Sequence, residues 1–488
     1  MTEDLDTEPR PRRVVVVAPM PPEKSAYALA RYSRSPDSIA QSLDWVRGHS
    51  SEKFLESFYF QYGHASIADL GHCVFCFEGI SELAAIDVED EPLWDGQAKS
   101  SRYQDFSKGQ IITPPELRGT DGEAIYQQAA ARLIGRYLEI HRLLVEHIAG
   151  QNPRPEEMKE GAYRRTIEAR AYDVARYLLF LGISTNIGQV ASIRTLEKQM
   201  RRLGASPYGE VRELAGEMHE ACAAPPGCIW DESQAQEPLA PTLARYADPD
   251  LVSKQARENV RKWACQNLSL GAAIEVPGVD LIRAADPLDE IAATLLYAVT
   301  SYPFRQLLDE VASWSRPRRR EVLDAALANR VRRDELLREF RSGYAYVFDT
   351  VMDIGAYRDI HRHRRCQQFR QDYTEDLGCD TPPQIAEAGV AELYRAALAE
   401  AAEARAILRG ISARAADYLM PFAARVRSLY KMDFAEAEYI SRVRSGVKGH
   451  ISYRTVAWDM RRRILEREPD LGELIHATPP TVEEPLTR

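Results

Sequence analysis

The sequence predicts a helix-rich α+β protein built from two tandem copies of one unit. Two observations support this prediction. Each half begins with a short apolar run, followed by a helical stretch, a proline and a second helical stretch. Similar patterns then return in the same order at a separation of roughly half the chain, far longer than the period of a solenoid. We therefore expect domains at residues 12–225 and 270–465, joined by a linker at residues 226–269.

The first element of each copy is predicted to be a buried strand. Val14–Val17 is a run of β-branched residues, and Ile274–Pro277 stands at the corresponding place in the second half. Helical stretches follow at residues 26–46 and 287–311, and each is interrupted by a proline. Each copy therefore opens with a strand and a pair of helices.

Later segments repeat as well. Residues 173–203 resemble residues 417–445 in length, and both have a helical period, so we expect helices there. The first and last dozen residues of the chain are charged and rich in proline, which is typical of loose ends.

Composition narrows the possible functions. The formal net charge of −10 argues against broad binding of nucleic acid. No apolar run reaches the ~18 residues that a membrane span requires. Seven cysteines without a recognisable secretory signal indicate reduced thiols and a cytoplasmic protein. Cys73 and Cys76 form a lone pair without a second pair at zinc spacing, so no metal site is expected.

A basic run, His361–Arg365, is the strongest candidate for chemistry. Val347, Val351 and Ile354 precede it at helical spacing, so the run follows a half-buried helix. Arginine forks suit a phosphate or a carboxylate. A solvated basic helix end would also explain the run, because cations are favourable at a helix C-terminus. The arginine-rich stretch 315–341 leaves open an interaction module that binds RNA or an acidic partner.

A polar loop at Gln97–Tyr103 is the second candidate. Ser100 and Arg102 alternate there on one side of an extended segment and could hold an anion. An ordinary turn would explain the same residues.

Together with their contexts, these segments resemble the flavin-dependent thymidylate synthase family. Gly63–Ser66 and Phe75–Ser81 are similar to the beginning of the family's sequence pattern. An Arg-His-Arg triplet follows in the family, and this position falls on Asp90–Pro92. At the family's spacing beyond the triplet stand Ser100 and Arg102, as in its Ser-x-Arg loop. The first copy thus keeps the loop and lacks the triplet.

The second copy shows the reverse arrangement. Arg362–Arg364 matches the triplet, whereas Asp372 and Thr374 occupy the loop positions, where Asp372 would repel a phosphate. Asp359 stands where the family has Gln. Downstream matches around Arg176, Arg194 and Arg212 in the first copy, and around Asp417, Asp433 and Arg454 in the second, extend the resemblance over most of both halves.

The resemblance implies an enzyme that transfers a one-carbon unit reductively to C5 of a pyrimidine nucleotide, with dUMP the first candidate. FAD would be the cofactor, and NADPH and methylenetetrahydrofolate the co-substrates. Family members are homotetramers whose sites form between subunits. We therefore expect a homodimer of this chain that mimics the tetramer, with two working composite sites. A catalytically divergent flavin- or nucleotide-binding protein with a regulatory or structural role is the alternative.

The resemblance also implies roles for individual residues. Which of Arg212 and Arg454 serves the working site stays open. The expected flavin-binding residues are Arg362, His363, Arg364 and Arg194; the substrate-binding residues are Ser100, Arg102, Arg176 and Arg212; the catalytic residues are Arg362, His363 and Arg454.

Overall fold

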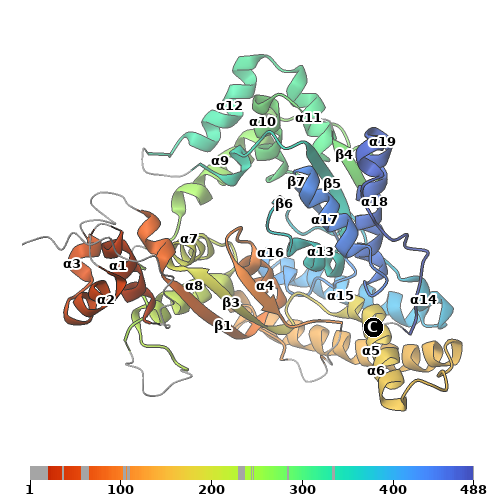
Figure 1. Cartoon of the computed structure of the whole chain (residues 1–488). Helices are drawn as coiled ribbons and strands as arrows, with labels where there is room; N and C mark the ends of the chain where they lie inside the picture. Colours follow the sequence, from red (N-terminus) through yellow and green to blue (C-terminus); the bar gives the residue numbers. More distant parts are fainter. Residues whose placement is uncertain are drawn as a thin grey trace, which may run out of the picture. The chain divides into compact units, whose positions relative to one another are not determined.

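The chain forms two compact units (Figure 1). Unit one comprises residues 1–73, 192–197 and 219–246, and unit two comprises residues 74–191, 198–218 and 247–488. The predicted strand Val14–Val17 and the residues Gly63 and His64 lie outside the described residues. This computed structural model describes residues 20–33, 35, 38–56, 65–102, 106, 110–228, 237–242, 244–245, 247–282, 285–331 and 336–486.

Unit one is mainly helical. Helix α1 (Pro22–Tyr32) packs against α2 (Ile39–Gly48), which confirms the predicted helix pair and its break. Ser38 begins α2 with a reciprocal capping box, in which its hydroxyl accepts from the backbone of Gln41. The further elements are α3 (Glu52–Leu55) and the 3₁₀ turn η2 (Ala65–Leu70).

Unit two holds the greater part of both repeats. The first repeat contains β1 (His72–Ser81), α4 (Glu82–Glu89), β2 (Asp95–Ala98), η3 (Pro115–Leu117), α5 (Asp121–Gln151), α6 (Glu160–Ala175), η4 (Arg176–Leu178), β3 (Ser184–Ser192), α7 (Ile193–Gly204) and α8 (Gly209–Ala223). β1, β3, α7 and α8 have end residues that belong to unit one.

The second repeat follows the same order and adds helices at its beginning. It contains α9 (Leu251–Asn267), β4 (Val279–Ile282), α10 (Pro287–Tyr297), α11 (Phe304–Ser313), α12 (Arg316–Leu327), η5 (Arg338–Phe340), β5 (Tyr346–Asp353), α13 (Ile354–His361), β6 (Gln367–Arg370), α14 (Pro383–Glu387), α15 (Ala391–Arg409), α16 (Ala413–Asp417), β7 (Arg425–Met432), α17 (Phe434–Arg444), α18 (Ile451–Arg467) and α19 (Pro469–Gly472).

Each repeat contains one sheet, and the strand orders correspond. The strand order is β1-β3-β2 in the first repeat and β4-β5-β7-β6 in the second. In the second sheet, β5 pairs with β4 and β7, and β7 pairs with β6, all antiparallel. The helical prediction for residues 173–203 and 417–445 was wrong at their centres, where β3 and β7 lie. Both strands are short and mix polar with apolar residues, so the longer helical patterns on either side concealed them.

Two further predictions require correction. The opening strand of the second repeat is β4, which starts after Pro277 rather than at Ile274, and proline lacks the N–H that a strand ladder requires. The predicted linker 226–269 contains α9, whose buried Val260 packs in one apolar core with Leu296 and Leu429. The exact domain boundaries stay a prediction.

The two repeats meet through an antiparallel backbone pairing. Phe180 bridges to Pro421, Leu181 N–H donates to Met420 O at 3.1 Å, and Phe422 N–H donates to Leu179 O at 2.7 Å. Each segment ends just before the central strand of its own sheet. Equivalent residues therefore contact each other across a pseudo-twofold axis, as in an isologous interface.

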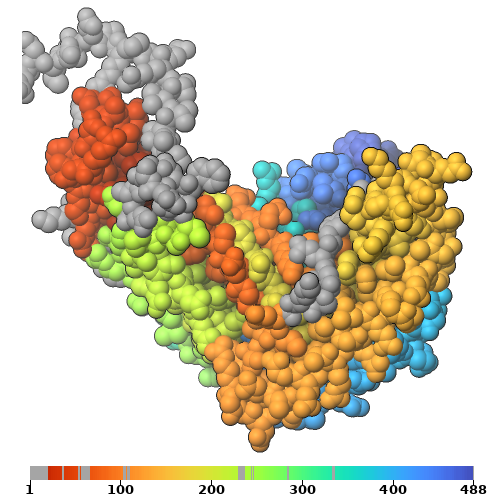
Figure 2. Space-filling model, turned by 90° about the horizontal axis from the view of Figure 1, so that it is seen from below, coloured from red at the N-terminus to blue at the C-terminus, as the bar shows by residue number. Residues whose placement is uncertain are grey.

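Smaller details repeat too. The hydroxyl of Tyr126 donates to Ile112 O, and that of Tyr394 donates to Asp380 O, both at 2.7 Å. These tyrosines lie on α5 and α15, which pack against each other (Figure 1). Figure 2 shows orange and yellow residues of α5 and α6 bordered by light-blue residues of the second repeat. The tandem repeat is thus confirmed.

The end of the chain differs from the prediction of a loose segment. Thr478 N–H donates to Ser445 Oγ at 2.9 Å, and two carbonyls further along accept from Arg454. None of the helices in the described ranges is long and apolar enough to cross a membrane.

Replacing Gly182 by Ala should destabilise the contact between the repeats. A Cβ there would lie 2.0 Å from Tyr126 Oη and 3.0 Å from Tyr418 O, so the tyrosine and its hydrogen bond must shift. Overpacking of this kind costs about 1–3 kcal/mol. We expect a lower melting temperature for G182A by calorimetry. The control G188A places its methyl group in open space; equal losses for both variants would contradict the packing argument.

Candidate functional site

The basic run lies in a tight turn between α13 and β6. Asp353 caps α13, its Oδ1 accepting from Ala356 N at 2.8 Å, and Arg362 is the C-cap residue. Gln368 Nε2 then donates to the carbonyls of His361 and His363, at 3.1 and 2.5 Å. Both histidines are buried. The basic run is therefore only partly solvated: its histidines are buried, Arg362 and Arg364 are half-buried and Arg365 is exposed.

Arginines from both repeats surround Asp359, a residue of α13. Arg176 Nη1 lies 3.1 Å from its Oδ2. Burial alone would raise the pKa of Asp359, but Arg176, Arg102, Arg444 and Arg362, in this order, lower it. Asp359 is therefore ionised within a strongly cationic region. We define the Asp359 cluster as Arg102, Asp173, Arg176, Asp359, Arg362 and Arg444.

Arg102 connects the repeats within this cluster. Its Nε donates to Asp173 Oδ1 at 2.8 Å and its Nη2 lies 3.3 Å from Asp173 Oδ2, a bidentate pair within the first repeat. Its Nη1 donates to Tyr453 Oη and its Nη2 to Lys448 O, both at 2.6 Å, in the second repeat. Ser100 Oγ accepts from the backbone N–H of Arg102 at 3.2 Å. The predicted loop and the predicted triplet thus come together in one place.

A buried ion pair lies beside the cluster. Arg358 Nη2 is 2.6 Å from Glu82 Oε2, and its Nη1 donates to Ser101 Oγ at 3.2 Å. Burial raises the pKa of Glu82 to about 7, although Arg358 and then Arg362 oppose the shift. Near neutral pH this carboxyl group can therefore gain or lose a proton as the charge around it changes.

Two arginines of the cluster keep unused donors. Arg362 is half-buried, and its guanidinium forms no hydrogen bond or ion pair with any residue in the described ranges. Arg176 is 1% exposed, and its Nε and Nη2 are buried without a hydrogen-bond partner among the described residues. Buried guanidinium groups are stabilised by an anionic partner. The cluster therefore has the donor set of an anion site.

His363 of the triplet supports a neighbouring arginine. Arg444 Nε always carries a hydrogen and donates to His363 Nε2 at 2.7 Å, so the ring proton of neutral His363 lies on Nδ1, 3.5 Å from Glu436 Oε1. Burial lowers the pKa of His363, and Glu436 only partly opposes this. Neutral His363 therefore accepts a hydrogen bond from Arg444 and fixes the position of this arginine.

Arg364 points toward the first repeat. Its Nη2 donates to Asp95 Oδ1 at 2.8 Å, and its guanidinium lies 5.1 Å from the centroid of the Trp94 ring. A planar cation on an indole forms a flat, cationic surface next to β2.

Three predicted site residues have partners outside the Asp359 cluster. Arg454 donates from Nε to Ser445 O at 3.0 Å and from Nη2 to Pro479 O and Val482 O. Arg212 donates to Ser206 O at 2.8 Å and is exposed. Arg194, in unit one, pairs with Asp69 at 3.0 Å.

In the corresponding region on the other side of the pseudo-twofold axis, arginines pair with carboxylates of the chain itself. Arg338 Nη1 lies 2.7 Å from Asp90 Oδ1, and Arg202 Nε lies 2.8 Å from Glu91 Oε1. Burial alone would raise the pKa of Asp90, but Arg338 and Arg202 lower it. We define the Asp87 cluster as Asp87, Asp90, Glu91, Arg202, Arg338 and Arg370.

The two clusters occupy equivalent places. Asp90 is the C-cap of α4, as Arg362 is the C-cap of α13. Asp372, which was expected to repel a phosphate, instead pairs with two arginines of the second repeat, Arg261 at 3.1 Å and Arg414 at 3.5 Å. In the first repeat the carboxylate of Asp90 therefore stands at the position that Arg362 has in the second.

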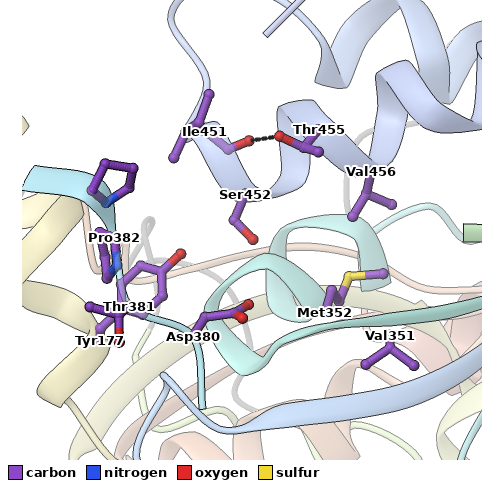
Figure 3. Close-up of a pocket in the computed structure, with 11 residues that line it drawn as sticks. Tyr177, Val351, Met352, Asp380, Thr381, Pro382, Ile451, Ser452, Thr455 and Val456 are labelled. Carbon is purple, nitrogen blue, oxygen red and sulfur yellow. Dashed lines mark hydrogen bonds between the residues drawn. The ribbon is translucent and has the colours of Figure 1, made fainter. Parts of the chain in front are cut away.

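A cavity of about 270 Å³ is lined by residues of both repeats, most of them from the second (Figure 3). Tyr177, which follows Arg176, and Ser452 line it, and both donate to the buried carboxylate of Asp353, Tyr177 at 3.4 Å. The first repeat has a similar pair in which the serine and the carboxylate have changed places: Ser81 precedes α4 as Asp353 precedes α13, and its Oγ donates to Glu210 Oε2 at 2.6 Å. The serine–carboxylate pair is therefore a shared feature of the repeats.

Comparison with known families agrees with the two-repeat fold. The sequence profile of the thymidylate synthase complementing protein family matches residues 15–225 and 289–470. The two matches fall on the two repeats and cover most of the chain. The chain therefore belongs to this family, the flavin-dependent thymidylate synthase family, as a tandem of two divergent copies.

Two relatives match most of the chain. The UPF0159 protein of Thermoplasma acidophilum is 26% identical over 486 residues, covering 92% of this chain and 93% of that protein. The UPF0159 protein of Chlamydia muridarum is 25% identical over 425 residues, covering 84% and 77%.

Among solved structures, two flavin-dependent thymidylate synthases of Helicobacter pylori with FAD and dUMP are similar to part of the chain. They show 16% and 19% identity and a TM-score of 0.27 each; both cover 41% of this chain, and 89% and 88% of their own chains.

Substituting His450 should change how stability depends on pH. His450 Nδ1 accepts from Ser452 N at 3.3 Å and caps α18; burial, followed by Arg176 and Arg102, lowers its pKa well below 6.5. The unfolded chain then binds more protons below about pH 6.5, so stability falls with falling pH. H450N keeps a capping acceptor and should show a smaller drop in melting temperature from about pH 7 to about pH 5. The exposed control H219N should match the parent; an unchanged slope in H450N would contradict this.

Proposed function

We propose that this chain is a flavin-dependent thymidylate synthase-like enzyme that transfers a one-carbon unit reductively to C5 of a pyrimidine nucleotide, dUMP first, at the Asp359 cluster. The observation that carries this proposal is the convergence of Arg102 and Arg176 of the first repeat with Arg362 and Arg444 of the second around Asp359. Its counterpart, the Asp87 cluster, is closed by internal carboxylates. Membership of the family supports the proposal.

The residues present fit an anionic nucleotide cofactor such as FAD. Arg362 offers an unpaired fork for a phosphate or a carbonyl. Arg364 on Trp94 offers a flat cationic surface for a planar ring. FAD and dUMP are named with the solved thymidylate synthases of Helicobacter pylori. When bound, a flavin supplies the reducing equivalents for the one-carbon transfer.

The chain's own residues supply orientation and charge. Arg176, with two buried unused donors, and Arg102 would hold the substrate phosphate together with Ser100. To attack the one-carbon unit, C5 must first become nucleophilic, with its negative charge shared with a uracil carbonyl oxygen as an enolate, and a guanidinium such as Arg362 would stabilise that charge. His363, held neutral, positions Arg444 for the same task. Arg212 donates to Ser206 O and Arg194 pairs with Asp69, and neither contact supports a role in the cluster. Arg454 holds the end of the chain instead.

A second function is a binding protein without turnover. Arg102 already donates to Asp173 and to two acceptors of the second repeat, and this alternative gives these bonds a fixed structural role. Affinity for dUMP without release of tritium from uracil C5 would support this alternative.

Replacing Arg362 by Ala should abolish most flavin binding. A hydrogen bond to a charged group contributes about 1.5–3 kcal/mol, so we expect roughly 10–100-fold weaker binding of FAD. Absorption between 350 and 500 nm, titrated with FAD, measures it. The matched control is R365A, three residues along the chain and exposed. Unchanged affinity in R362A, or equal loss in R365A, would sink the assignment.

The saturated protein should hold one flavin per chain. The Asp87 cluster pairs its arginines with carboxylates of the chain, and a second anion there would add charge to an already neutral region. Cofactor released from purified, FAD-saturated protein, measured against protein concentration, gives the ratio. Two flavins per chain would show that the Asp87 cluster is open to ligand.

A further inference from the structure

Residues 477–486, which we call the strap, lie along the second repeat without forming a helix or a strand. Thr478 N–H donates to Ser445 Oγ at 2.9 Å, just after α17. The strap then reaches Arg454 of α18 and Arg170 of α6, so it contacts both repeats.

Arginines hold the backbone of the strap. Arg454 Nη2 donates to Pro479 O at 3.2 Å and to Val482 O at 2.7 Å. Arg170 Nη2 donates to Glu484 O at 2.9 Å. Guanidinium groups bind anionic oxygens more strongly than neutral carbonyls, so these donors are occupied by their weaker kind of partner.

An acidic side chain of the strap lies in the same region. Burial lowers the pKa values of Arg170 and Arg454, and the negative charge of Glu483 opposes this shift in both. Arg170 also experiences the charges of Arg454 and Arg102. Three guanidinium groups thus gather where the strap places one carboxylate, and Arg102 belongs to the Asp359 cluster.

The strap is held by contacts that are easily exchanged. Glu483 and Glu484 are exposed, and Val482 is 43% exposed, so little apolar surface is buried there. Individual hydrogen bonds contribute about 0.5–1.5 kcal/mol. Segments with few buried apolar contacts open at low free-energy cost.

We propose that the strap is an autoinhibitory cover of the arginine site, which a phosphate-bearing ligand displaces by taking over Arg454 and Arg170. The ligand's phosphate replaces the Glu483 carboxylate and the strap carbonyls. Naming the ligand as a pyrimidine nucleotide rests on the proposed function; the competition for the arginines does not. A closed strap reduces the apparent affinity by the fraction of open chains.

The test compares three forms of the protein by calorimetric titration with dUMP and with inorganic pyrophosphate. These are the full chain, a chain ending at residue 476, and E483Q/E484Q, which keeps the strap but removes its charge. The control is E473Q, an exposed glutamate before the strap. We expect affinity to rise about tenfold or more on truncation, in part for the double variant, and not for the control.

Hydrogen exchange of the strap amides in the full chain gives an independent readout. Saturating ligand should speed exchange of peptides covering residues 477–486, because the strap leaves its arginines. Equal affinity of truncated and full chains, or slower strap exchange with ligand, would overturn the proposal. If dUMP binds no form but pyrophosphate binds the truncated chain more tightly, the proposed function fails and the strap stands. If neither probe binds any form, both fail.

Discussion

The antiparallel pairing of residues 177–182 with residues 418–423 is the constraint on which the rest of unit two depends. Its backbone groups are satisfied by the opposite repeat, so neither repeat can bury this segment alone. Because Phe180 meets its own equivalent, Pro421, the pairing sets a pseudo-twofold axis between the sheets. Arg176 stands directly before the paired segment. The backbone pairing therefore carries Arg176 from the first repeat to Asp359 of the second, and the composite arrangement follows from it.

Covalent linkage of the repeats removes the symmetry that an assembly of identical subunits would impose. A single substitution in such an assembly alters every site, whereas here the two helix ends can differ. The α4 end carries Asp90 and the α13 end carries Arg362. The serine–carboxylate pairs show the same freedom without a change in local charge. In the first repeat Ser81 donates to Glu210, and in the second repeat Ser452 donates to Asp353. There the hydrogen bond between a serine and a buried carboxylate persists while each residue moves to the other partner position.

The sequence contains enough information to locate the triplet and the loop, because their spacing within each repeat is local. It also indicates the repeat, through the order of similar segments. Strands β3 and β7 were missed because they are short, mix polar with apolar residues and lie between longer segments with a helical period. Arg444 and Asp173 were missed for a different reason. Each lies on an ordinary charged helix surface in sequence, and only tertiary folding brings Arg444 to His363 and Asp173 to Arg102. The strap was predicted as loose from its prolines and charges, since hydrogen bonds from distant arginines leave no local pattern.

The arginines of the Asp87 cluster indicate what the Asp359 cluster requires. Had this half only lost a ligand, apolar residues could have replaced its arginines, because burying an unpaired guanidinium is costly. Instead Arg202 and Arg338 each have a carboxylate of the chain within ion-pair distance. These carboxylates sit where the equivalent residues of the other half include Arg362. The interface between the repeats therefore tolerates buried arginines when an anion accompanies them. In the Asp359 cluster, Arg176 has Asp359 within ion-pair distance, but its Nε and Nη2 have no hydrogen-bond partner among the described residues, and this is the electrostatic reason for the anion that we propose there.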